Sequence, residues 1–67
     1  MLSDAPVTVP GSALRKYRET HGVEQQAVAA ELRHHRNTIA AWERDAEVDL
    51  RRQQLYRAAV RRLAGVA

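Results

Sequence analysis

The stretch GVEQQAVAAELRHHRNTIAAWERD, residues 22–45, decides the fold of this chain. Each half carries apolar side chains three positions apart, which are Ala29 with Leu32 and Ile39 with Trp42. Because residues three or four apart share one face of a helix, this spacing predicts helices over residues 25–32 and 36–44. Only the short polar segment RHH, residues 33–35, separates them. Two short helices joined by such a turn are typical of a helix-turn-helix, although other helical hairpins share the pattern.

Helix-forming sequence continues on both sides of this stretch. Residues 13–20 are rich in strong helix formers, and Gly22 is placed to end that helix. Downstream, Asp49 is a good N-cap for a final helix. The apolar residues of that helix recur with helical spacing, at Leu55, Tyr56, Ala59, Val60 and Leu63. With no strand alternation or internal repeat, the sequence predicts a compact all-α fold of four helices, with five as the alternative.

The first eleven residues differ from the rest of the chain. Residues 1–11 hold both prolines and show no helical period, so we expect a flexible arm there and a single domain over residues 12–67. The arm contains no lysine or arginine, so we do not expect it to bind phosphate. Its apolar residues Leu2, Val7 and Val9 are expected to pack on the domain or on a second subunit.

Composition excludes several classes of protein. The chain has no cysteine, so disulfides and thiolate metal sites are excluded. No apolar run approaches the length of a membrane span, and no secretory signal is visible, so a cytoplasmic location is expected. Carboxylates do not flank a histidine at a suggestive spacing, and a phosphate loop is missing, so we expect no enzyme and no cofactor. The adjacent His34 and His35 favour a surface pair over a metal site.

The net charge of +3 is unevenly distributed. Residues 1–50 carry six basic and eight acidic side chains, whereas residues 51–67 carry five arginines and no acid. A basic segment on a small domain favours a polyanionic partner such as nucleic acid. The preference is weak, because a solvated helix face has the same composition.

The quoted stretch resembles the Xre/Cro-like, or lambda-repressor-like, helix-turn-helix family of bacterial and phage repressors. The residues that carry the resemblance are Gly22, Val23, Glu24, Gln25, Val28, Ala29, Thr38, Ile39, Trp42, Glu43 and Arg44. Upstream, LRKYRE over residues 14–19 is similar to the family's first helix, whose arginine pairs with the glutamate of the third helix. The matching residues are Arg18 and Glu43, which we interpret as a structural ion pair. The resemblance covers about residues 13–63.

The chain departs from the family pattern at three positions. Arg33 stands where the family prefers glycine in the turn, and a non-glycine residue in the same left-handed backbone costs about 1 kcal/mol. His35 replaces the usual serine or threonine cap of the third helix, and Asp45 replaces the glycine that follows that helix.

The resemblance implies that the helix over residues 36–44 enters the major groove of double-stranded DNA. The expected base contacts are Arg36, Asn37, Thr38, Ala40 and Ala41, although helix propensity explains the two alanines equally well. The arginine fork suits guanine O6 and N7, and the asparagine amide suits adenine N6 and N7. The expected phosphate contacts, which position the protein without reading sequence, are Gln25, Gln26, Arg33, His35, Arg44 and Arg51.

Together these features predict a sequence-specific, nucleoid-associated transcription regulator. We expect a repressor that binds a palindromic operator as a homodimer, through an interface at Val60, Leu63, Val66 and Ala67. The alternative is a protein-interaction module of the same fold, such as an antitoxin or a phage regulatory subunit, with weak or lost DNA binding. In that case a protein partner replaces DNA as the main ligand.

Overall fold

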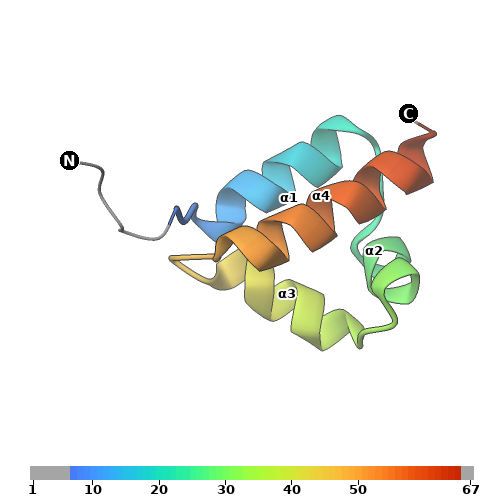
Figure 1. Ribbon diagram of the computed structural model, residues 1–67. Helices are drawn as coiled ribbons and strands as arrows, with labels where there is room; N and C mark the ends of the chain where they lie inside the picture. The colour runs from blue at the N-terminus through green and yellow to red at the C-terminus, as the bar shows by residue number, and fades with distance from the viewer. Residues whose placement is uncertain (1–6, 66–67) are drawn as a thin grey trace.

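Four α-helices make up the fold in the computed structural model, which describes residues 7–65 (Figure 1). They are α1 (Gly11–Thr20), α2 (Gln25–Leu32), α3 (Arg36–Arg44) and α4 (Leu50–Ala64). The pair α1 and α4 lies side by side, and both α2 and α3 pack against it. The all-α class is confirmed, and α4 continues as one helix, so the described residues form four helices and not five.

The helix ends follow from a few residues with special backbone or capping properties. Gly22 takes the left-handed conformation (φ +67°) directly after α1, as its position in the sequence predicts. The side chain of Asp49 caps α4, because its Oδ1 accepts a hydrogen bond from the backbone nitrogen of Arg52 at 2.9 Å. Both helices therefore end or begin where the local sequence directs them.

The core lies between all four helices and is built mainly from aliphatic side chains. Its buried members are Leu14, Val23, Val28, Ala29, Ile39, Val48, Tyr56, Ala59 and Val60. Leu32 and Trp42 are only partly buried at its edge. Two members of the apolar pattern predicted for α4 lie outside the core, since 41% of Leu55 and 39% of Leu63 are exposed. Leu55 follows the helical spacing but lies one residue outside the face that the other helices cover.

Residues 7–10 lie against the domain. Val9 and Val48 form an antiparallel bridge, with backbone hydrogen bonds of 3.2 and 2.7 Å. The buried side chain of Gln53 donates from Nε2 to the carbonyl oxygens of Val7 and Val48, at 3.2 and 3.0 Å. The expectation that Val9 packs on the domain therefore agrees with its position. Val7 does not pack on the domain, because 66% of it is exposed, so its packing on a second subunit stays a prediction. Leu2 lies outside the described residues.

The first helix starts earlier than the sequence indicates, at Gly11, which was expected to end the arm. Its backbone nitrogen donates to the carbonyl oxygen of Asp45 at 2.7 Å. A Cβ atom here would overlap the carbonyl oxygen of Trp42 and would lie 2.6 Å from the carbonyl carbon of Glu43. Only glycine allows α1 to approach the last turn of α3 this closely, and this approach sets the position of α3.

Candidate nucleic-acid interface

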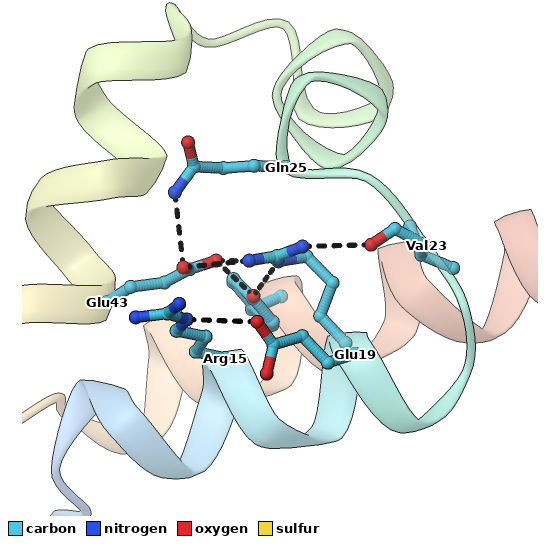
Figure 2. A network of polar contacts seen from close by, with 7 residues as sticks. Arg15, Glu19, Val23, Gln25 and Glu43 are labelled. Atoms are coloured by element: carbon cyan, nitrogen blue, oxygen red, sulfur yellow. Dashed lines mark hydrogen bonds and ion pairs between the residues drawn. The ribbon is translucent and has the colours of Figure 1, made fainter.

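A buried polar network fixes the inner side of α3 (Figure 2). Arg18 of α1 forms two hydrogen bonds with Glu43, from Nε at 2.9 Å and from Nη2 at 3.1 Å. The same carboxylate accepts from the hydroxyl of Tyr56 at 2.5 Å and from Nε2 of Gln25 at 3.1 Å. Arg18 also donates from Nη1 to the carbonyl oxygen of Val23 at 2.9 Å. One glutamate thus connects α3 to each of the other three helices.

The electrostatics of this network keep Glu43 ionised. Burial raises the pKa of Glu43, but hydrogen bonds from Arg18 and Tyr56, together with the Arg18 charge, outweigh burial and lower the pKa overall. Burial and the neighbouring Glu43 carboxylate raise the pKa of Tyr56, so its hydroxyl stays protonated and donates. The Arg18 and Glu43 side chains are only 11% and 4% exposed, so the predicted partners form a buried ion pair.

The outer side of α3 carries the residues expected to read bases. Arg36, Asn37 and Ala41 are exposed, while Thr38 and Ala40 are partly buried. Ile39 and Glu43 point the opposite way, into the protein. The helix therefore presents a ridge of polar and small side chains and is anchored from behind by the buried network. Its exposed side chains are of the types that form hydrogen bonds with base edges.

The turn before α3 keeps its left-handed residue without glycine. Arg33 ends α2 with φ +59° and ψ +40°, the conformation that glycine adopts most easily. His35 then caps α3, because its Nδ1 accepts a hydrogen bond from the backbone nitrogen of Asn37 at 3.1 Å. The next residue back, His34, lies edge-on to Trp42 with the ring centres 5.4 Å apart. Arginine and histidine thus take the places of the family's glycine and hydroxyl cap.

Asp45, the third departure from the family pattern, has a different explanation. Its backbone is extended (φ −68°, ψ 136°), so this chain needs no glycine there. Its side chain accepts from the backbone nitrogen of Glu47 and from Arg52 Nη1, both at 3.0 Å. The hydrogen bond from Glu47 and the Arg52 guanidinium lower the pKa of Asp45. Arg52 is therefore engaged in holding the loop between α3 and α4, a role that sequence reasoning missed.

The residues expected to contact phosphate lie at the two ends of the helix-turn-helix, in its turn and in the first turn of α4. Gln25 is partly buried and gives one amide hydrogen to Glu43, which leaves its second amide hydrogen. The other members of the set, Gln26, Arg33, His35, Arg44 and Arg51, are all exposed. Gln25 and Gln26 form the first turn of α2, where backbone N–H groups lack intrahelical partners and favour anions.

A cleft of about 440 Å³ opens beside α3 and was not foreseen from the sequence. Residues of α1, α2 and α3 line it, namely Arg15, Arg18, Gln25, Ala40, Glu43 and Arg44. Sequence patterns did not indicate it, because its walls come from helices that meet only in the folded chain. Ala40 has the smallest side chain in this lining.

The expected dimer interface needs one correction. Val60 is fully buried in the core of the single chain and is not available to a second subunit. The apolar face of α4 to which Val60 belongs is covered by α1 and α2. Leu63 is 39% exposed and remains a candidate, whereas Val66 and Ala67 lie outside the described residues.

Within residues 7–65, no group of three or more histidine, aspartate or glutamate side chains is arranged to hold a metal ion. None of the four helices is long and apolar enough to cross a membrane.

Comparison with known proteins identifies the family. Residues 14–59, well over half of the chain, match the family model HTH_3, described as Helix-turn-helix. Neither the curated proteins nor the solved structures gave a significant match. Proteins of this family typically bind DNA and are not typically enzymes. The matched segment contains most of α1, all of α2 and α3, and the buried network that orients α3, and so the chain belongs to the Xre/lambda-repressor-like helix-turn-helix family of DNA-binding transcription regulators.

Proposed function

We propose that the protein is a cytoplasmic repressor that binds a palindromic operator as a homodimer, with one α3 helix in the major groove of each half-site. The observation that carries this proposal is the outer face of α3, where Arg36 and Asn37 are exposed on a helix braced from behind by Glu43. In this role Arg36 donates two hydrogen bonds to guanine, and Asn37 pairs with adenine. Thr38, Ala40 and Ala41 contact thymine methyl groups or allow close approach.

Phosphate contacts orient the domain on the duplex. In this proposal Gln25, Gln26, Arg33, His35, Arg44 and Arg51 bind the two DNA strands on either side of the groove. The exposure of five of them and the location of Gln25 at the start of α2 support these roles. Such contacts fix the register of α3 but do not distinguish one base pair from another.

Dimer formation follows from the small size of the domain, which offers few base contacts. Half-sites would be about 34 Å apart, one turn of DNA. Leu63, with Val66 and Ala67, is proposed as the contact between subunits.

A protein-interaction module is the second candidate function, because Leu55 and Leu63 are both about two-fifths exposed on α4. Exposed leucines of this kind suit a protein partner as well as a second copy.

Selection of bound sequences from random double-stranded DNA tests the proposal, and it should yield a palindrome. Arg36→Ala should then weaken binding to the selected site by about tenfold or more while hardly changing binding to scrambled DNA. Arg61→Ala, on the exposed side of α4, is the matched control. Equal losses on both DNAs would reduce Arg36 to a phosphate contact, and a failure to select any sequence would favour the protein-interaction module.

Sedimentation with the selected duplex measures how many chains bind one palindrome. If the protein binds as a homodimer, we expect two chains per palindrome. A single chain on the palindrome would refute the dimer while leaving sequence-specific binding intact.

A further inference from the structure

The cleft beside α3 has chemistry that neither base reading nor core packing uses. It is lined by three arginines, Arg15, Arg18 and Arg44, and by one carboxylate, Glu43. Four hydrogen bonds, two from Arg18 and one each from Gln25 and Tyr56, are directed at that carboxylate, so its charge is locally compensated. The remaining positive charge of the lining comes from Arg15 and Arg44, which are both exposed. An anion is the ligand that such a cleft attracts.

The three arginines differ in how firmly they are held. Arg18 is buried, and its guanidinium is occupied by Glu43, Tyr56 and the Val23 carbonyl. Arg15 forms a hydrogen bond of 3.1 Å with Glu19 one turn away, and the two side chains are 62% and 54% exposed. Exposed pairs of this spacing are weak, so Arg15 can exchange its partner at little cost. Arg44 is exposed and takes part in none of the ion pairs among residues 7–65.

The location of the cleft connects it to the DNA-reading face. Ala40 and Arg44 line it, and with Arg36 they follow one another at four-residue intervals along one edge of α3. Gln25, at the start of α2, lies across Glu43 from Arg15 in the close-up view (Figure 2). A DNA strand running beside α3 would therefore meet Arg44, Gln25 and Arg15 together.

We propose that α1 takes part in DNA binding, and that Arg15 binds a backbone phosphodiester seated over this cleft together with Arg44. On binding, the Arg15 guanidinium exchanges Glu19 for the phosphate, while Glu19 remains in solvent. This inference rests on the proposed function and extends the interface to a helix outside the helix-turn-helix. Sequence-independent contact is its expected character, because a phosphate carries no base information.

The test compares Arg15→Gln with Arg61→Gln, which removes the same charge from an exposed arginine outside the cleft. The probe is mixed-sequence double-stranded DNA, titrated at several salt concentrations. Arg15→Gln should weaken binding by about tenfold and reduce the slope of log K against log salt by about 0.9. Arg61→Gln should change affinity by less than about twofold near physiological salt, where screening is strong beyond about 8 Å.

Two further variants keep the outcome clear. Arg15→Lys should recover part of the affinity, since it restores the charge without the fork. Glu19→Gln releases Arg15 and should tighten binding by about twofold in the wild-type background but not in Arg15→Gln. The Arg15 variants should stay folded, with melting temperatures within about 4 °C of the wild type, because the Arg15 side chain is mostly exposed.

The results separate this inference from the proposed function. If the wild type binds DNA and Arg15→Gln matches Arg61→Gln in affinity and salt slope, the role of Arg15 is refuted while DNA binding stands. If the wild type shows no salt-dependent binding to duplex DNA, the proposed function fails and the phosphate contact fails with it. A loss on the selected operator with no loss on the mixed-sequence duplex would also overturn the inference, because it would make Arg15 a base contact.

Discussion

Replacing Glu43 by glutamine tests how far the buried network supports the fold. The substitution keeps the size of the side chain and removes its charge. It leaves the guanidinium of Arg18, whose side chain is only 11% exposed, without a counter-ion. It also replaces one acceptor oxygen with an NH₂ group, although Arg18, Tyr56 and Gln25 all direct donors at this side chain. At least one donor then faces another donor.

The expected loss is large relative to the stability of so small a domain. Removing one partner of a buried ion pair costs about 3–5 kcal/mol. A chain of 67 residues has an unfolding free energy of about 3–10 kcal/mol in total. We therefore expect Glu43→Gln to lose about 3 kcal/mol and to be partly unfolded at room temperature if the wild type lies at the lower end of that range.

Urea denaturation at pH 7, followed by circular dichroism, measures the effect. With a slope near 1 kcal/mol per molar urea, the midpoint should fall by about 3 M. Glu19→Gln is the matched control, because it removes an exposed glutamate from Arg15. That variant should lose no more than about 0.5 kcal/mol.

The pH dependence of the difference provides a second measurement. Because the folded protein lowers the pKa of Glu43 below its ordinary value of 4.5, its contribution is fully present above pH 4.5. It is lost as the pH falls through the lower folded value, so the stabilities of wild type and Glu43→Gln should converge in acid. Asp45 and Asp49, whose pKa values are also lowered by hydrogen bonds, are common to both proteins and cancel in the comparison.

A penalty below about 1 kcal/mol at pH 7 would refute the reasoning, because it would mean that the network contributes no more than a surface pair. A penalty that is the same at pH 3 and pH 7 would show that packing, not the carboxylate charge, carries the effect.

Two further predictions concern the backbone. Arg33→Gly should stabilise the protein by about 1 kcal/mol, measured by thermal melting, because Arg33 holds a left-handed conformation at φ +59°. Arg33→Ala is the control, because alanine in this conformation keeps the same backbone strain. If both variants were stabilised equally, the gain would come from removing the arginine charge and not from relieving the strain. Gly11→Ala should destabilise by about 3 kcal/mol, since its Cβ would overlap the backbone of Trp42 and Glu43. Ser12→Ala, at an exposed neighbour, should be nearly silent in the same urea titration, and a tolerated Gly11→Ala would contradict the close approach of α1 to α3.

Local sequence was sufficient to predict the helices but not what joins them. Periodic apolar residues located α2 and α3, Gly22 located the end of α1, and Asp49 located the start of α4, because these signals act within a few residues of themselves. The start of α1 at Gly11 was missed, since the requirement for glycine comes from Trp42 and Glu43, some thirty residues away. Nothing in the sequence near Gly11 indicates that contact.

The sequence predicted only part of the candidate site, again because long-range contacts leave no signal near each residue. The family resemblance indicated Arg18 with Glu43, but Tyr56 was interpreted only as a core residue. Buried tyrosines usually direct the hydroxyl to a partner, so a signal existed, although it did not name Glu43. The sequence predicts Val60 at a dimer interface because the last helix has more apolar residues than one face needs. In the fold, α1 and α2 together cover its apolar face and bury Val60 completely.

The arrangement of the network bears on how the outer face of α3 is held. Base reading requires side chains held within about half an ångström of their productive positions, by supports that are themselves fixed. Glu43 lies in the last turn of α3 and is held by α1, α2 and α4, while the Gly11 contact braces the same turn through the backbone. His35 caps the N-terminal end of α3, and the buried side chain of Ile39 holds the middle of the helix against the core. Because both ends and the centre of α3 are fixed independently, the exposed arginine and asparagine extend from a helix that has little freedom to tilt.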